Sequence, residues 1–211
     1  ASSLQVRLRS TLILAEHSNE KLSPATLNTI KAASALGGDV SCLVLGEKCA
    51  TISSALSSVE GVQKILIVEN LAFRGLLPEP VTQAVLALHK QYNFSAILAP
   101  ATAFGKNVAP RIAAKLNVSP ISDIIQIKEP EVFVRALYAG NALCTVKSLD
   151  PVKVITVRPT AFEAAKVLGG SAKEEKITLP DIKNDMSEFI GQELTKSERP
   201  ELTGARIVVS G

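Results

Sequence analysis

The sequence has 211 residues, of which 46% are hydrophobic and 4% aromatic, and its formal net charge is +3. This composition suffices for a sizeable core and excludes an intrinsically disordered chain, while so small a charge gives no reason to expect a nucleic-acid or anionic-membrane partner. Tryptophan is absent, so the core must consist mainly of Ala, Val, Ile and Leu, the usual filling of a parallel sheet covered by helices. Apolar runs are too short to span a bilayer, so we expect no membrane insertion.

The first residues are basic and rich in serine. Arg7, Arg9 and three serines precede the first acidic residue, Glu16. This composition is typical of the end of a mitochondrial transit peptide, and a frayed basic terminus explains it equally well. We assign residues 1–9 to a residual basic tail.

Short apolar runs alternate with helical patterns from residue 10 to residue 120. The predicted strands are 11–15, 40–45, 64–68 and 96–99. Each is followed by apolar residues at helical spacing, and the clearest stripe is Val81, Ala84, Val85 and Leu88. Strands that alternate with helices predict a right-handed, doubly wound parallel sheet, the Rossmann-like α/β class.

The pattern changes after residue 120, where strand-like segments follow one another without helices between them. These segments are 121–128, 131–138, 143–147 and 152–157. Their connections contain Pro130, Gly140 and Pro151 and resemble tight turns. Because sequential strands joined by tight turns pair antiparallel, we expect a small antiparallel sheet appended to the parallel one, within an α/β domain that spans residues 10–158.

An appended sheet leaves an open edge, and sheet edges are either protected or used to bind a partner. Five hairpin residues are our candidates for a partner contact: Val134, Arg135, Tyr138, Asn141 and Val146. The alternative, an ordinary hairpin without a partner, is equally compatible with the sequence.

The remainder of the chain has a weaker pattern. We assign residues 159–194 to a wrapping arm and linker. Within it we expect an exposed charged segment at 173–176, a short strand at 177–179 and a short helix at 185–194. Residues 195–211 combine a charged linker, a short apolar strand and a Ser-Gly turn, which is how a nucleotide-binding βα unit opens, so we expect a further domain to begin there.

Motifs for nucleotide chemistry are incomplete. Gly105-Lys106 lies between a strand and a helix, but Pro100 and Asn107 stand where a Walker A motif requires Gly and Ser or Thr. The dinucleotide fingerprint G-x-G is absent from the sequence. The polar loops after the predicted strands are 16–19, 46–48, 69–70 and 100–102. They could cradle an adenine nucleotide, although ordinary helix caps explain them better.

The cysteines and histidines do not form a metal motif. Cys42, Cys49 and Cys144 contain no C-x-x-C pair, and any single disulfide would leave one thiol unpaired, so we expect free thiols in a reducing compartment. Their spacing from His17 and His89 does not match a zinc site. We expect His17 to be a surface polar residue and His89 to be partly buried.

Asp123 is the most conspicuous acid, because it lies inside an apolar strand-like segment. An acid in such a place needs a partner. We expect a structural ion pair with Arg111 or Arg135, and we nominate no catalytic or metal-binding residue.

Seven stretches in order along nearly the whole chain share the pattern of one family. They are LAEH at 14–17, GLLPE at 75–79, FGKN at 104–107, PRIAAKL at 110–116, PISDII at 120–125, YAGNALCTVK at 138–147 and RPEL at 199–202. The last is followed by ARIVVSG at 205–211. These stretches resemble the alpha subunit of electron-transfer flavoproteins, in particular its animal mitochondrial branch.

The resemblance implies a subunit that pairs with a smaller beta subunit. In that family FAD accepts electrons from acyl-CoA and related dehydrogenases of fatty acid beta-oxidation and passes them to a membrane quinone oxidoreductase. The flavin is held mainly by the C-terminal domain of the alpha subunit, which would lie beyond Gly211, and AMP is expected on the beta subunit. The antiparallel sheet is completed by a strand from the partner, and the location is the mitochondrial matrix.

This chain would then be the N-terminal domain of such an alpha subunit. Its role would be a scaffold for heterodimer assembly, without FAD ligands of its own, within an electron carrier that is not an enzyme. The alternative is an autonomous adenine-nucleotide-binding or hydrolase domain of similar α/β fold.

Overall fold

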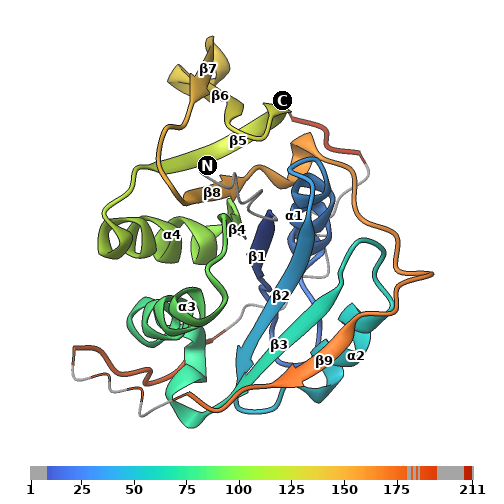
Figure 1. Cartoon of the computed structure of the whole chain (residues 1–211), viewed down its shortest axis with the longest axis vertical. Coiled ribbons are helices and arrows are strands. Elements are labelled where there is room, and N and C mark those ends of the chain that lie inside the picture. Colours follow the sequence, from blue (N-terminus) through green and yellow to red (C-terminus); the bar gives the residue numbers. More distant parts are fainter. Residues whose placement is uncertain (1–8, 180–181, 183, 185, 194–206, 211) are drawn as a thin grey trace, which may run out of the picture.

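The computed structural model describes residues 9–179, 182, 184, 186–193 and 207–210. One sheet of nine strands organises this described part, in the order β7-β6-β5-β8-β4-β1-β2-β3-β9 (Figure 1). The strands are β1 (Ser10–Leu14), β2 (Asp39–Gly46), β3 (Lys64–Glu69), β4 (Ala96–Pro100), β5 (Pro120–Glu129), β6 (Val132–Leu137), β7 (Ala142–Lys147), β8 (Lys153–Val157) and β9 (Lys173–Lys176). The helices are α1 (Pro24–Ser34), α2 (Ala50–Ser57), α3 (Pro78–Tyr92) and α4 (Ala103–Leu116), with short 3-10 turns η1 (Leu71–Leu76), η2 (Tyr138–Gly140) and η3 (Pro159–Ala161).

The parallel part of the sheet is wound in two directions. On one side of β1 lie β2 and β3, and on the other side lie β4, β8 and β5, with parallel pairing throughout. The winding therefore reverses between β1 and β4, as in doubly wound folds. The predicted class, a Rossmann-like α/β fold with an antiparallel addition, is confirmed.

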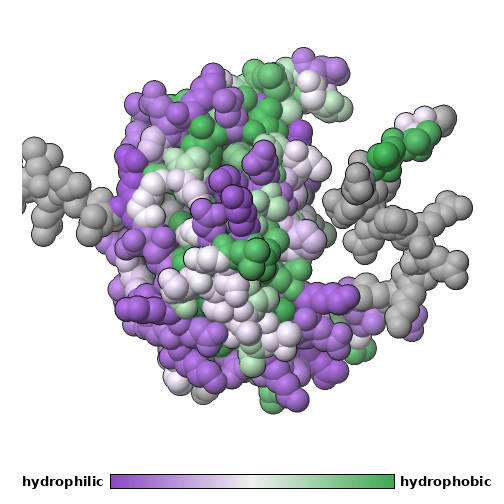
Figure 2. Space-filling view, turned by 90° about the vertical axis from the view of Figure 1, so that its right-hand side faces the viewer, coloured by the Kyte–Doolittle hydropathy of each residue, from purple (hydrophilic) through white to green (hydrophobic). Residues whose placement is uncertain are grey.

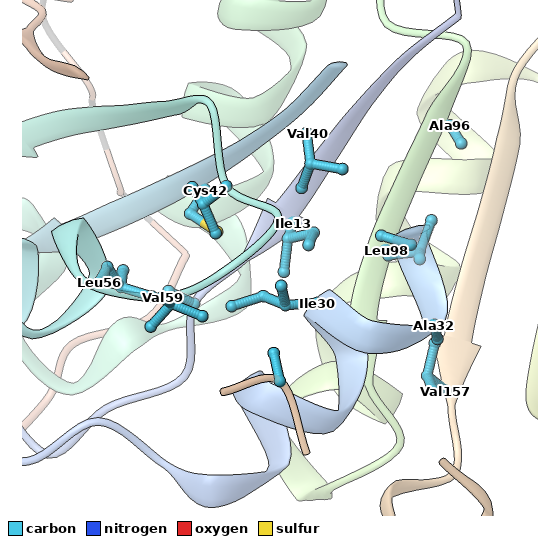
Figure 3. Packing of buried hydrophobic residues seen from close by; sticks show 14 of the residues in the cluster. Ile13, Ile30, Ala32, Val40, Cys42, Leu56, Val59, Ala96, Leu98 and Val157 are labelled. Carbon is cyan, nitrogen blue, oxygen red and sulfur yellow. The ribbon is translucent and has the colours of Figure 1, made fainter. Parts of the chain in front are cut away.

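Helices cover both faces of this sheet and create two apolar clusters. On one face, Ile30 of α1 lies beside Ile13 of β1, and Leu56 of α2 belongs to the same cluster (Figure 3). On the other face, Leu12 of β1 packs with the predicted stripe of α3, whose members are all buried. Neighbouring residues of β1 serve opposite clusters because strand side chains alternate between faces. Each buried Leu or Ile stabilises the fold by about 1.5–3 kcal/mol.

Local signals set the helix boundaries. α1 begins at Pro24, since the fixed φ of proline suits the first helical position. α3 and α4 end at Asn93 and Asn117, both in the left-handed conformation with a φ of 55°. Asparagine tolerates this conformation, which stops a helix.

The prediction that the segment 152–157 is an antiparallel strand was wrong. β8 runs parallel between β4 and β5, and the antiparallel pairs of the described sheet are β5 with β6 and β6 with β7. Four of the five residues in its sequence KVITV are buried, which is the pattern of a central parallel strand. The antiparallel hairpin is therefore continuous with the parallel sheet.

The charged segment at 173–176 is largely exposed, as expected, but it also forms a strand, which the sequence pattern did not indicate. Residues 173–176 form β9, which pairs parallel with β3, whereas the strand expected at 177–179 is absent from the described structure. Side chains hold β9 in place: the Tyr92 hydroxyl donates to the Glu175 carboxylate at 2.5 Å, and Lys64 Nζ lies 2.9 Å from that carboxylate. These contacts are tertiary, so strand propensity could not reveal them.

The arm that follows β9 contacts the start of α3. The Ser187 hydroxyl donates to Glu79 Oε2 at 2.8 Å. The Phe189 ring covers Gly75, where an added Cβ would lie 2.1 Å from a ring carbon. The described part of the expected helix at 185–194, residues 186–193, contains no helix.

The chain ends are largely outside the described residues. This holds for residues 1–8 of the predicted tail and for most of the segment 195–211, of which residues 207–210 are described and form no strand. Among the described helices, none is long and apolar enough to cross a membrane.

Candidate functional site

The described sheet ends in two strands of different chemistry, β9 and β7. β9 carries the sequence KEEK, and charged side chains on an edge strand discourage pairing with another chain. β7 carries ALCTVK, in which half-buried and exposed side chains alternate. The hairpin of β6 and β7, at the top of Figure 1, therefore offers the edge better suited to a partner strand.

The hydrogen bonds of the hairpin reveal which backbone groups of β7 face outward. The Ser148 N–H donates to the Glu131 carbonyl at 2.8 Å, and the register continues from this pair so that Val146 lies opposite Phe133. Hydrogen-bonded and non-hydrogen-bonded pairs alternate along an antiparallel ladder. Val146 therefore turns its N–H toward β6, and Thr145 turns its N–H toward the free edge.

By the same alternation, Leu143, Thr145 and Lys147 present their N–H and C=O groups to the outside. All three side chains are exposed, and that of Leu143 is 70% exposed. We call these three residues the docking edge. An extended partner strand can pair with such groups by β-augmentation. In Figure 2, hydrophobic side chains gather at the level that the hairpin occupies in Figure 1.

The five nominated contact residues all lie on this hairpin, but in unlike environments. Val134 is 5% exposed and Val146 packs against the core, so neither is freely accessible to a partner. Tyr138, which is 81% exposed, and Asn141 lie at the η2 turn and are open to a partner. Arg135 is half-buried.

Sequence reasoning missed all three members of the docking edge, because none of Leu143, Thr145 and Lys147 was among the nominated residues. The alternation of side chains in ALCTVK carried a signal, because Leu143, Thr145 and Lys147 share one face. The direction of the backbone groups, however, depends on the pairing register, which the sequence does not specify.

An ion pair fixes the base of the hairpin. Asp123 has a φ of 57° at an irregularity in β5, and its N–H donates to the Thr156 hydroxyl at 2.8 Å. Arg158 grips its carboxylate with two hydrogen bonds, of 3.2 and 2.5 Å. The hydrogen bond from Arg158 holds the pKa of Asp123 below its ordinary value.

The expected partners of Asp123 were wrong. Arg158 takes this place because β8, which precedes it, lies beside β5 in the parallel sheet. Arg111 instead lies 3.6 Å from Glu79. Arg135 acts on Asp123 only through its charge.

The crevice where the winding reverses is the place at which such folds commonly bind nucleotides. Here it contains an acid. Glu16 follows β1 and is within hydrogen-bonding reach of Thr102 and Ser23, the N-cap residues of α4 and α1. Burial raises the pKa of Glu16, the two hydroxyls partly offset this, and its Oε2 has no hydrogen-bond partner among the described residues.

This arrangement does not fit a nucleotide or flavin phosphate. Helix N-termini favour anions, but here the Glu16 carboxylate already lies beside two of them and would repel a phosphate. Gly105 does not serve a phosphate either, because an added Cβ would lie 1.8 Å from the Pro100 carbonyl oxygen. Its small size is required for the close approach of α4 to β4.

Replacing Glu16 with Gln tests this reading of the crevice. The pKa of Glu16 is higher in the folded state than in the unfolded state, so between these two pKa values the native state binds more protons. As the pH rises through this range, the ionised carboxylate therefore lowers the stability of the protein. We expect Glu16→Gln to raise the midpoint of thermal unfolding at pH 7 and to have little effect at pH 4. A lower midpoint at pH 7 would show that the carboxylate stabilises the fold.

His17 is another correction, because it is 8% exposed and not a surface residue. Its Nε2 lies 2.9 Å from the Leu45 carbonyl, and its Nδ1 accepts the Asn19 N–H at 3.1 Å. This pattern requires the neutral ring with its proton on Nε2. His17 thus links the loop after β1 to the end of β2. Burial lowers the pKa of His17, so the residue is a poor general base.

The two buried thiols, Cys42 and Cys49, lack the features of reactive groups. Burial raises the pKa of Cys42 to about 12 and that of Cys49 to about 11. A thiolate is the reactive form, so both are inert at neutral pH. Across the described ranges, His, Cys, Asp and Glu form no group of three that could hold a metal ion.

Comparisons with known proteins agree with the architecture. The curated protein "Probable electron transfer flavoprotein subunit alpha, mitochondrial" of Caenorhabditis elegans is 50% identical over 97% of this chain and 61% of its own length. Electron transfer flavoprotein subunit alpha of Pseudomonas aeruginosa is 50% identical over 95% of this chain and 64% of its own length. The mitochondrial subunit alpha of Dictyostelium discoideum is 45% identical over 95% of this chain and 60% of its own length. The chain thus spans about three fifths of the relatives it matches.

The family model described as the electron transfer flavoprotein domain matches residues 11–182. This range includes the parallel sheet, the hairpin and β9. The resemblance noted in the sequence is confirmed. The chain belongs to the electron transfer flavoprotein family, and the relatives named above are alpha subunits.

Proposed function

We propose that this chain is the N-terminal, partner-docking domain of an electron transfer flavoprotein alpha subunit, and that a strand of the beta subunit pairs with the docking edge on β7. The observation that carries the proposal is the outward direction of the backbone groups of Leu143, Thr145 and Lys147, next to exposed apolar side chains. The opposite edge, β9, is charged and held by its own contacts.

The whole heterodimer would carry electrons on FAD from acyl-CoA and related dehydrogenases to a membrane quinone oxidoreductase, in the mitochondrial matrix. The names of the relatives support a flavoprotein of electron transfer, and several of those names include the word mitochondrial. The flavin would be held by a part of the subunit outside this chain and AMP by the beta subunit. The acidic crevice at Glu16, which does not fit a phosphate, supports this division.

The proposal is tested by proline at the docking edge. Thr145→Pro removes an outward N–H and leaves the bonds between β6 and β7, whereas proline at Val146 would remove a bond inside the hairpin. One edge hydrogen bond contributes about 0.5–1.5 kcal/mol, and the proline ring also obstructs the incoming strand, so we expect affinity for the beta subunit to fall about tenfold or more.

The matched control is Thr145→Val, which keeps the N–H and a β-branched shape. Both variants are placed in the full-length subunit, and their affinity for the beta subunit is measured beside the thermal unfolding of the free subunit. Equal affinity for a folded Thr145→Pro variant and for Thr145→Val would contradict docking at this edge.

A further inference from the structure

A groove adjoins the end of the docking edge. Its volume is about 340 Å³, and it lies between the start of β5, the hairpin and the connection from β7 to β8. Pro120 and Ile121 of β5 and Val146 of β7 supply apolar walls. Arg135 and Ser148 supply polar ones. The groove is therefore amphipathic, and the strand that would bear a partner forms part of its wall.

Two polar atoms of this lining are buried and unsatisfied. Arg135 Nε and the Ser148 hydroxyl oxygen have no hydrogen-bond partner within the part of the chain that the structure describes. Buried donors without acceptors are costly and rare in native proteins. Two of them in the lining of one groove indicate that a group from outside the described chain satisfies them.

The charges around the groove identify that group. Asp123, whose pKa the charge of Arg135 helps to lower, is already bound by Arg158 through two hydrogen bonds. Asp150, which also lines the groove, accepts the Ser119 N–H at 2.9 Å. The Arg135 guanidinium thus has no carboxylate of its own among the described residues. A guanidinium is best matched by a carboxylate, which accepts its N–H donors in charge-assisted hydrogen bonds.

We propose that this groove receives a carboxylate side chain of the beta-subunit strand that docks on β7, and that Arg135 binds it. This inference rests on the proposed function. Cys144 lies opposite Arg135 in the register, so its small side chain is on the same face of the hairpin as that of Arg135. A partner strand would lie about 4.8 Å beyond β7, so an Asp or Glu on that face reaches toward Arg135 across Cys144.

The test uses Arg135→Met in the full-length subunit, since methionine keeps an apolar stem and removes the charge and the donors. We expect the dissociation constant for the beta subunit to rise about 30-fold or more, because the partner carboxylate is left unpaired. The free subunit should unfold at an unchanged or higher temperature, since an unsatisfied buried group has been removed. If Arg135 served only the fold, Arg135→Met would lower the unfolding temperature of the free subunit and leave the dissociation constant for the beta subunit unchanged. These two results would overturn the proposal.

The matched control is Arg74→Met, which removes the same charge from an arginine whose side chain is 68% exposed and lies 3.9 Å from Glu47, outside the hairpin. It should leave the dissociation constant within about twofold, since exposed pairs contribute little. An equal loss of affinity for the beta subunit in both variants would show that binding depends only on net charge, and would overturn the proposal.

Thr145→Pro, measured in parallel, separates the two proposals. If it weakens the heterodimer and Arg135→Met does not, the carboxylate site is wrong and the docking edge stands. If neither variant weakens the heterodimer, both proposals fail. If inorganic phosphate stabilises the free subunit through Arg135 while Arg135→Met leaves the heterodimer intact, the groove is a site for free anions and the proposal is overturned.

Discussion

Gly105→Ala is expected to lower the free energy of unfolding by about 3 kcal/mol, which for a chain of this size corresponds to about 6–12 °C in melting temperature. An added Cβ would lie 1.8 Å from the carbonyl oxygen of Pro100. That oxygen belongs to the backbone of a buried strand, and Pro100 is paired with Val157 of β8, so it cannot move without displacing the sheet. The free-energy cost of this clash exceeds the gain of about 1 kcal/mol that replacing glycine with alanine brings inside a helix.

Gly191→Ala is the control for this prediction. Apart from its chain neighbours, no heavy atom of the described residues lies within 4 Å of the position of its added Cβ, in contrast with Gly105. Urea unfolding of the two variants measures the difference. A loss for Gly105→Ala within about 0.5 kcal/mol of that for Gly191→Ala would show that α4 does not pack on β4 as closely as described.

Phe133→Ala should both destabilise the protein and disable the docking edge. Phe133 is fully buried in the cluster on the α1 face, so it anchors the hairpin to the core. Removing a buried Phe side chain costs about 3–5 kcal/mol. Since Phe133 lies opposite Val146, we also expect β7 to lose its fixed position and the affinity for the beta subunit to fall.

Phe133→Leu distinguishes packing from any effect of the aromatic ring itself. A leucine refills much of the space, so the loss of stability should stay below about 1.5 kcal/mol and docking should persist. Denaturant unfolding and affinity for the beta subunit are measured for both variants. A Phe133→Ala variant that loses less than about 1 kcal/mol would mean that the hairpin is not held by this residue.

The parallel sheet was predictable from sequence because its strands and helices have distinct apolar periods. The stripe from Val81 to Leu88 repeats at helical spacing and is buried as expected. The hairpin of β6 and β7 was predictable because tight turns join alternating strands.

Features that depend on contacts between distant segments were not predictable. The short connection before β8 resembles a turn, yet β8 does not pair with β7 and instead lies parallel between β4 and β5. This position brings Arg158 to Asp123. β9 consists of charged residues with low strand propensity and is held by Tyr92 and Lys64. The burial of Glu16 beside two helix N-termini likewise arises only when the sheet assembles.

The most direct test of docking at β7 is amide hydrogen exchange, residue by residue, in the free full-length subunit and in the heterodimer. We predict that the N–H groups of Leu143, Thr145 and Lys147 exchange rapidly in the free subunit, because they face outward, and become protected when the beta subunit binds. The N–H groups of Cys144 and Val146, which face β6, should be protected in both states. Unchanged exchange at Leu143, Thr145 and Lys147 in the heterodimer would contradict the account.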